Sequence, residues 1–361
     1  MNTKLPSVAL IIAPALLVAA TQANAQSYRF TDLGTLGGVN SEAYGINNTG
    51  VVVGTAATIS GPKHATVWNG AIPTDLGTLG GTSSYAIGIN NASVVAGESY
   101  TAGNAFHATV WNGMTATDLG TLGGTYSFVQ SINKTGQVVG AAYTTGNAAL
   151  HATVWNGTTA TDLGSLVQGD SFAMSINDAG VVAGFGSGNA ILWNGSTTTY
   201  LGTLGGSGSS AGSINNAGIV AGWSQTSDGA WHATVWNGTM TTDLGTLGGT
   251  NSQATAINSY GQVAGYSSIK DNSANHATVW NGTMAIDLNS FLDFSTVDAG
   301  WVLTIANAIN DNGWIVGNAD NSITGERHGY LLMPIHEPET FAMVLAGLGL
   351  LGVISRRRKS M

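Results

Sequence analysis

The stretch HATVWNGAIPTDLGTLGG at residues 64–81 contains two sequence signatures that return along the chain. The first, HATVWNG, recurs letter for letter from residues 107, 151, 232 and 276. The second, DLG or a variant of it, begins at residues 32, 75, 118, 162, 200, 243 and 287, at steps of 43, 43, 44, 38, 43 and 44 residues. A third marker, Ile-Asn, begins at residues 46, 89, 132, 176, 214, 257 and 309. A period of this length is typical of repeat architectures, and both of the longer series give seven units.

Each unit has the pattern of four short strands. A small apolar strand such as AYGIN, from Ala43, leads through the turn Asn47–Gly50 into VVVG, from Val51. HATVW forms the third strand, and Asn-Gly, the strongest two-residue hairpin signal, precedes a fourth strand that ends in TDLG. Four antiparallel strands in about 43 residues predict one blade of a β-propeller.

The phase of the repeat predicts how the ring closes. The repeats open on a lone fourth strand at residues 28–33 (YRFTDL) and end on a lone third strand at residues 328–333 (HGYLLM). Pairing of these two strands would complete a seventh blade and leave no open sheet edge at the joint. We therefore expect an all-β, seven-bladed β-propeller whose ring is closed by its N-terminal and C-terminal strands.

Composition fits this fold and excludes several partners. Charged residues make up 8% of the 361 residues, while 43% are hydrophobic and 52 are glycine, which suits many short strands joined by tight turns. Residues 26–336 contain five basic and seventeen acidic residues, a formal charge of −12, which argues against a nucleic-acid partner. The chain has no cysteine, so disulfides, thiol chemistry and cysteine zinc sites are excluded.

The two ends differ from the repeats. Residues 1–25 have the pattern of a signal peptide, with Lys4, an apolar run and the small-residue cleavage site Ala23–Ala25. An apolar run at 341–354, short for a transmembrane helix of about 20 residues, precedes a basic cluster that favours retention on the cytoplasmic side. We expect a signal peptide at 1–25, a propeller at 26–335 and a sorting or anchor segment with a single short transmembrane helix at 336–361.

The repeated histidines are predicted to be structural. Five copies on five blades would lie too far apart to bind one ligand, so each histidine should hydrogen-bond within the fold, to Ser, Thr or Asp of a neighbouring strand. The repeated tryptophans should fill the space between blades, and the Asp of DLG should be a turn or strand-end acceptor. The fourth unit keeps Trp193 but lacks the histidine and has Tyr200 in place of Asp. The other predicted structural residues are His64, His107, His151, His232, His276, Trp68, Trp111, Trp155, Trp236, Trp280, Asp75, Asp118 and Asp243.

Two families resemble parts of this chain. The units, with four copies of DLGTLGG, resemble the probable extracellular repeat of the HAF family from about Thr31 to Met333. The tail FAMVLAGLGLLGVISRRRK, behind Glu337 and Pro338, resembles the PEP-CTERM sorting signal, although His336 stands where that signal has its first proline. The resemblance implies export, an inner-membrane intermediate, recognition by an exosortase-type membrane protease and delivery to the envelope, outer surface or matrix. Its basic residues are Arg356, Arg357, Arg358 and Lys359.

A ligand site is expected where the copies differ. The loops between second and third strands vary in length and content, and aromatic rings beside acids and amides suit sugars. The alternative is that these residues merely cover the blade edge. The predicted ligand-binding residues are Tyr100, Trp223, Asp228, Trp231 and Tyr266.

Three classes of function stay open. The first is a surface binding or matrix protein, associated with exopolysaccharide or another surface protein, and the second is a structural envelope protein. The third is a secreted propeller glycosidase or polysaccharide lyase, for which Glu42 and Asp170 are the unrepeated carboxylates near inner strands. The sequence has no GxSxG, HExxH, phosphate-loop or EF-hand motif, so we predict no catalytic residue, metal or cofactor.

Overall fold

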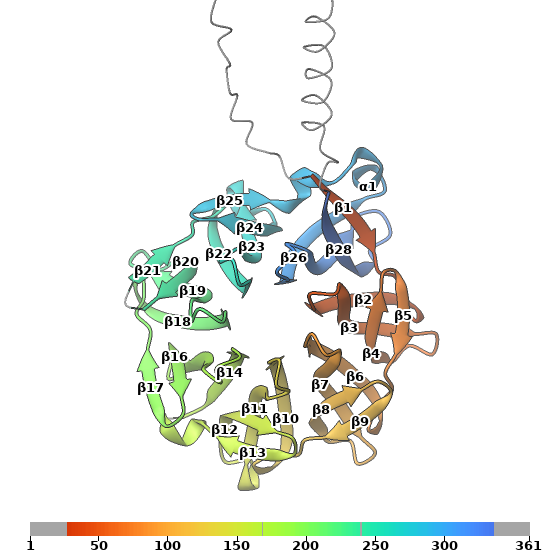
Figure 1. Ribbon diagram of the computed structural model, residues 1–361. Coiled ribbons are helices and arrows are strands. Elements are labelled where there is room, and N and C mark those ends of the chain that lie inside the picture. The colour runs from red at the N-terminus through yellow and green to blue at the C-terminus, as the bar shows by residue number, and fades with distance from the viewer. Residues whose placement is uncertain (1–26, 168, 239, 336–361) are drawn as a thin grey trace, which may run out of the picture. The chain divides into compact units, whose positions relative to one another are not determined.

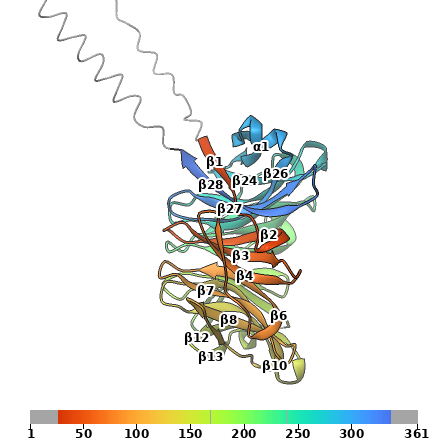
Figure 2. The ribbon, with the colours of Figure 1, turned by 90° about the vertical axis from the view of Figure 1, so that its right-hand side faces the viewer.

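The computed structural model describes residues 27–335, apart from 168 and 239. The predicted signal peptide and sorting segment lie outside these residues. Tyr28–Pro334 forms one compact unit of seven four-stranded sheets arranged around a common centre (Figure 1). The sheets of neighbouring blades lie one above another when the ring is seen from its side (Figure 2). The predicted all-β, seven-bladed propeller is confirmed.

The blades are numbered in chain order: β2–β5 form blade 1, and β26–β28 with β1 form blade 7. The innermost strands are β2 (Gly37–Ile46), β6 (Gly80–Ile89), β10 (Gly123–Ile132), β14 (Ser171–Ile176), β18 (Gly205–Ile214), β22 (Gly248–Ile257) and β26 (Trp301–Ile309). The second strands are β3 (Val51–Thr58), β7 (Val94–Thr101), β11 (Val138–Thr144), β15 (Val182–Gly186), β19 (Val220–Thr226), β23 (Val263–Ile269) and β27 (Ile315–Asn321).

The third strands carry the HATVW repeat. They are β4 (Lys63–Asn69), β8 (Phe106–Asn112), β12 (Leu150–Asn156), β16 (Asn189–Asn194), β20 (Trp231–Asn237), β24 (Asn275–Asn281) and β28 (Arg327–Ile335). The outermost strands are β5 (Ile72–Asp75), β9 (Thr115–Asp118), β13 (Thr159–Asp162), β17 (Thr197–Tyr200), β21 (Met240–Asp243), β25 (Met284–Asp287) and β1 (Ser27–Asp32).

The strands leave two faces at the ends of the ring. We call the loop face the side with the loops between second and third strands and the linkers between blades. The turn face is the opposite side, with the turns between first and second and between third and fourth strands. This division follows from the up-and-down order of the four strands in every blade.

Blade 7 closes the ring in the predicted way. Its sheet has the order β1-β28-β27-β26, so the strand at the N-terminal end of the compact unit completes the last blade. Leu33 N donates to Gly329 O at 3.0 Å, and the same bond joins Leu76 N to Ala65 O inside blade 1. The joint therefore reproduces the pairing that the other blades make within one continuous segment.

The inner strands are longer than the sequence pattern indicated. β2 begins at Gly37 rather than at Ala43, because Gly37 pairs with Thr58 ahead of a bulge. Glu42 consequently lies within a strand and not near its start. The glycine pair that ends DLGTLGG is thus the beginning of the next inner strand and not part of the turn.

The tryptophans lie between neighbouring blades. Trp68, Trp111 and Trp155 are fully buried, as are the other three that end a HATVW-type strand. Trp111 packs against Val53 and Ala65 of the preceding blade, and the same relation holds around the ring. In blade 7 the aliphatic Leu332 takes this position.

Within residues 27–335, apart from 168 and 239, helical structure is limited to short segments in the loops and linkers of the loop face. These are η1 (Thr145–Asn147), η2 (Gly164–Leu166), η3 (Lys270–Asn272), η4 (Leu288–Phe291) and α1 (Phe294–Asp298). Within the described part of the chain, no helix is both long and apolar enough to cross a membrane.

Candidate functional site

The repeated histidines form a ring of His–Asp pairs on the loop face. In blade 1 the His64 Nδ1 lies 2.8 Å from Asp75 Oδ2, and both side chains are partly exposed. The histidine begins the third strand and the aspartate ends the fourth, so antiparallel pairing brings them side by side. The same contact, at 2.7 to 2.9 Å, is made by His107–Asp118, His151–Asp162, His232–Asp243, His276–Asp287 and His328–Asp32.

Each aspartate also shapes the linker to the next blade. Asp75 Oδ1 accepts from Gly77 N at 2.7 Å, and Gly77 is left-handed with φ 69°, a conformation that favours glycine. Gly77 O then accepts from Ser84 Oγ, which itself accepts from Ala65 N at 2.8 Å. One histidine–aspartate pair therefore connects its own blade to the first strand of the next one.

His328 uses this arrangement to close the ring. Its Nδ1 lies 2.9 Å from Asp32, 296 residues away, and its ring also contacts Val39 O through Nε2 at 3.1 Å. The hydrogen bond to Asp32 raises the pKa of His328 above its ordinary value, although burial acts in the opposite direction. The sequence analysis did not include His328 among the repeated histidines, although it begins the lone third strand.

The predicted ligand residues do not form one site. Trp223 and Trp231 pack edge to face with their ring centres 4.5 Å apart, and Asp228 lies in the loop between their strands. Tyr100 belongs to blade 2, where its ring packs on Phe106 at 4.8 Å.

Tyr266 belongs to blade 6 and donates to Gln253 Oε1 at 2.7 Å. Burial raises the pKa of its phenol. The five residues are thus spread over three blades, and only the blade 5 residues lie together.

The carboxylates considered for glycosidase chemistry already have partners. Glu42 Oε2 accepts from Tyr44 Oη at 2.7 Å and pairs with Lys63 Nζ at 3.1 Å. Asp170 Oδ1 accepts from Leu150 N at 2.9 Å. Glu42 lies in blade 1 and Asp170 precedes the first strand of blade 4, so the two belong to blades on different parts of the ring.

Glu98 is the most deeply buried carboxyl of the loop-face half. It stands in β7 and accepts from Val129 N of the next blade at 2.9 Å. Burial raises its pKa to about 7, and the hydrogen bond from Val129 opposes this rise. Glu98 therefore connects the second strand of blade 2 to the inner strand of blade 3 and is buried.

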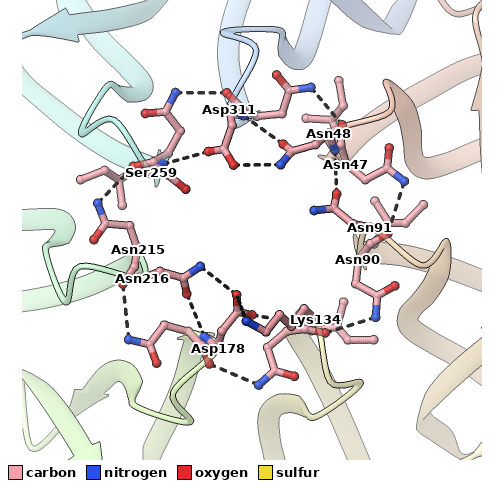
Figure 3. A pocket seen from close by; sticks show the side chains of 18 of the residues that line it. Asn47, Asn48, Asn90, Asn91, Lys134, Asp178, Asn215, Asn216, Ser259 and Asp311 are labelled. Atoms are coloured by element: carbon pink, nitrogen blue, oxygen red, sulfur yellow. Dashed lines mark hydrogen bonds and ion pairs between the residues drawn. The ribbon is translucent and has the colours of Figure 1, made fainter.

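A polar funnel opens at the centre of the turn face (Figure 3). The Asn of every Ile-Asn marker donates its Nδ2 to the backbone oxygen of the equivalent Asn in the next blade, at 2.9 to 3.3 Å. The last link runs from Asn310 back to Asn47, at 2.9 Å, so the ring is complete. The donors are Asn47, Asn90, Asn133, Asn177, Asn215, Asn258 and Asn310.

The residue after each ring asparagine forms the mouth of the funnel, and here the copies differ. These residues are Asn48, Asn91, Lys134, Asp178, Asn216, Ser259 and Asp311. Lys134 Nζ lies 3.3 Å from Asp178 Oδ2, and Asn216 Nδ2 donates to the same oxygen at 2.8 Å (Figure 3). Asn48 Nδ2 donates to Asp311 Oδ2 at 2.8 Å. The funnel has a volume of about 220 Å³ and is lined by asparagine and aspartate side chains together with the marker isoleucines, Lys134 and Ser259.

The two carboxylates of the funnel stay ionised. Burial alone would raise the pKa of Asp178, but hydrogen bonds from Lys134 N and Asn216 and the charge of Lys134 lower it below its ordinary value. Hydrogen bonds from Ser259 N and Asn48 likewise outweigh burial and lower the pKa of Asp311. Among the described residues, no group of three His, Cys, Asp or Glu is placed to bind a metal ion.

One protein-family model matches the C-terminal end of the chain. Residues 337–359 match the PEP-CTERM protein-sorting motif. The predicted sorting residues Glu337, Pro338, Arg356, Arg357 and Arg358 fall within this match, which lies outside the described residues. The motif implies processing by an exosortase and export to the cell envelope or surface.

Solved structures with some likeness to the chain include two fungal proteins. One is a triple arginine-to-alanine mutant of AofleA from Arthrobotrys oligospora, at 13% identity and a TM-score of 0.37, covering 86% of this chain and 90% of that one. The other is the six-bladed fucose-recognising lectin of Aleuria aurantia, at 13% identity and a TM-score of 0.31, covering 68% and 93%. No curated protein matches the chain.

Proposed function

We propose that the chain is an exported propeller of HAF-type repeats that an exosortase-type protease processes at the inner membrane and that then associates with exopolysaccharide in the envelope or matrix. The observation that carries this proposal is the sorting motif at 337–359, directly behind a closed propeller. The chain has no cysteine, so the exported fold must be stable without disulfides, and the closed ring of blades supplies that stability.

The chemistry of the propeller supports a neutral polysaccharide rather than a charged polymer. Residues 26–336 have few basic residues, so a strongly anionic polymer would meet a surface of like charge. The paired rings of Trp223 and Trp231 on the loop face offer an aromatic surface, with Trp231 38% exposed. Gln225, Ser207 and Asp228 lie on neighbouring segments of the same blade and offer polar groups.

We propose a binding or structural role and not catalysis. Glu42 is held by a lysine and a tyrosine, Asp170 by a backbone amide, and Glu98 is buried against Val129. A glycosidase needs two carboxyl groups on either side of one bond, at roughly 5 to 10 Å from each other. Incubating the protein with exopolysaccharide of the producing cells and measuring new reducing ends and unsaturated products tests this, and release of either would overturn it.

Sorting and binding are tested separately. Intact mass of the protein from envelope and culture fractions of an exosortase-positive host should show a chain from Gln26 to near Glu337. Neutralising Arg356, Arg357, Arg358 and Lys359 should prevent that processing, because the basic end holds the segment at the cytoplasmic face. Finding only the chain that ends at Met361, in the inner membrane, would mean that the tail is a permanent anchor. Co-sedimentation of the processed protein with the neutral exopolysaccharide tests binding.

A further inference from the structure

Blade 4 departs from the repeat at its loop-face end. Its β15–β16 hairpin has only Ser187 and Gly188 between the strands, with φ of 51° and 79°, whereas blade 1 has four residues between Thr58 and Lys63. Asn189 occupies the histidine position, because Ala190 N donates to Ser209 Oγ as Ala65 N does to Ser84 Oγ.

The aspartate position is also changed. Tyr200 pairs with Ile191 in the register in which Asp75 pairs with Thr66. The Tyr200 side chain is 54% exposed, and Asn189 Nδ2 donates to Ser187 O of its own hairpin at 3.1 Å. Both members of the pair found in the other six blades are therefore replaced at once.

A hollow occupies the space beside these replacements. It measures about 570 Å³, which lies in the usual range of small-molecule sites, whereas the central funnel lies below that range. The linker from blade 3 forms its other wall, since this linker folds into η2 and not into the DLGTLGG turn. The hollow, named here the blade 4 hollow, is lined by Ser165, Leu166, Val167, Ser187, Asn189 and Tyr200.

The lining favours an uncharged, polyhydroxylated ligand. None of the six residues carries a charge. The exposed Tyr200 ring and the 40% exposed Leu166 side chain offer apolar surface for the C–H face of a sugar. Two polar side chains add hydrogen-bonding groups: the amide oxygen of Asn189 can accept a hydrogen bond, and Ser165 Oγ, which donates to Asp162 O at 3.2 Å, can still accept one.

The hollow continues toward the aromatic pair of blade 5. Gly188 O accepts from Ser209 N at 3.1 Å. A methyl group placed on Gly208 would lie 3.3 Å from the Trp231 ring and 3.4 Å from Gly188 O. The ring of Trp231 and the tip of the blade 4 hairpin thus lie against the same glycine, which gives the surface room for more than one sugar residue.

We propose that the blade 4 hollow, with Tyr200 as its aromatic wall, is the site at which a neutral polysaccharide chain binds. This rests on the proposed function and locates it. Loss of the His–Asp pair in this blade removes the groups that stand at the same positions in the other six blades, and the hollow lies beside their replacements.

The most direct test restores the His–Asp pair of the other blades in blade 4. The N189H/Y200D double variant places the common pair back in blade 4 and removes the aromatic wall, while changing no residue of the blade 5 pair. Processed protein from envelope fractions is titrated with labelled oligosaccharides from the neutral exopolysaccharide, with polygalacturonate as the acidic comparison. We expect the double variant to bind at least about 10-fold more weakly, and Tyr200→Ala to do the same, while Tyr200→Phe stays within about 3-fold of the wild type.

Tyr260→Ala is the matched control, because Tyr260 is a 77% exposed tyrosine in a turn of the opposite face, and it should bind as the wild type does. The melting temperature of each variant shows whether it is folded, and Tyr200→Ala decides the question if the double variant does not fold. Wild-type binding that survives in both Tyr200→Ala and the double variant overturns this site and leaves the proposed function standing. Failure of the wild-type protein to bind the neutral oligosaccharides, or a preference for polygalacturonate, overturns the polysaccharide-binding proposal and the site with it.

Discussion

The linker after blade 4 and the linkers after blades 1, 2 and 5 differ in the direction of one backbone carbonyl. In the linkers after Asp75, Asp118 and Asp243 the glycine is left-handed and its carbonyl accepts from a serine, as Gly77 O does from Ser84 Oγ. After Tyr200, Gly202 lies outside the left-handed region, and its carbonyl accepts from Trp236 Nε1 at 3.0 Å. The equivalent carbonyl therefore meets a serine in three linkers and an indole in the linker after blade 4.

A carbonyl that meets the serine leaves the buried indole N–H of the next blade without a hydrogen bond. The indole N–H of Trp111, which is equivalent to that of Trp236, has no hydrogen-bond partner among the described residues, and the same holds for Trp68 and Trp155. An unpaired buried donor costs about 1 to 3 kcal/mol. The linkers after blades 1, 2 and 5 make the serine bond and leave the indole of the next blade unpaired, whereas the linker after blade 4 makes the indole bond instead.

The closing blade gives the largest test of this comparison. Removing β1 (Ser27–Asp32) takes away both the fourth strand of blade 7 and the partner of His328. We expect the melting temperature to fall by at least about 10 °C, because blade 7 loses its fourth strand and β28 becomes an exposed sheet edge. Replacing the exposed helix α1 with a Gly-Ser linker of equal length is the control and should change it far less. An unchanged melting temperature without β1 would disprove closure by this strand.

Single histidine variants compare the closing pair with an internal pair. We expect His107→Ala to lower the free energy of unfolding by about 1 kcal/mol, since its partner Asp118 stays partly in contact with water. His328→Ala should cost more, because His328 also contacts Val39 O and joins segments 296 residues apart. Urea unfolding measures both, and added zinc should shift neither curve. Equal losses would show that the closing pair has no special weight.

The pH dependence of stability gives a further test of the closing pair. The pKa of His328 is raised in the folded protein, so its contribution is fully present below its unfolded pKa of about 6.5 and is lost as the pH rises through the folded value. Melting temperatures between about pH 6 and pH 8 should therefore decline more in the wild-type protein than in His328→Gln. Parallel profiles for the two proteins would contradict this assignment.

The smallest expected change in stability belongs to N189H/Y200D, the variant that restores the His–Asp pair in blade 4. In N189H/Y200D the new pair should bring the connection of the other blades, while turning Gly202 would take the carbonyl away from Trp236 Nε1. We expect these changes to cancel within about 1 kcal/mol. The indole N–H resonance of Trp236 should move toward those of Trp68 and Trp111. A resonance that does not move would show that the aspartate does not set the direction of the linker carbonyl.

Much of the fold could be predicted because each repeat contains short sequence motifs that mark its strands and turns. The spacing of the markers gave the number of blades, and the lone strands at residues 28–33 and 328–333 gave the closure. The start of the inner strands could not be read, because Gly37–Glu42 has no apolar alternation and pairs through a bulge.

The site was harder to predict because ring geometry decides which residues meet. Tyr100, Trp223 and Tyr266 all precede or follow variable loops, yet they belong to three blades and cannot converge. The Ile-Asn marker was visible as a period, but its role depends on seven turns meeting at one centre. The blade 4 hollow depends on two replacements, Asn189 and Tyr200, that become neighbours only through strand pairing.

The ring of asparagines has a consequence for how such a protein can change in size over evolution. Every link uses a side-chain amide from one blade and a backbone oxygen from the next, and all seven run in the same direction around the funnel. Because the acceptor is a backbone group, a blade does not depend on the side chain of its neighbour for this bond. A duplicated unit of about 43 residues would carry its own donor and acceptor into the circle, so a gene for this architecture can gain or lose a whole repeat without a compensating substitution elsewhere.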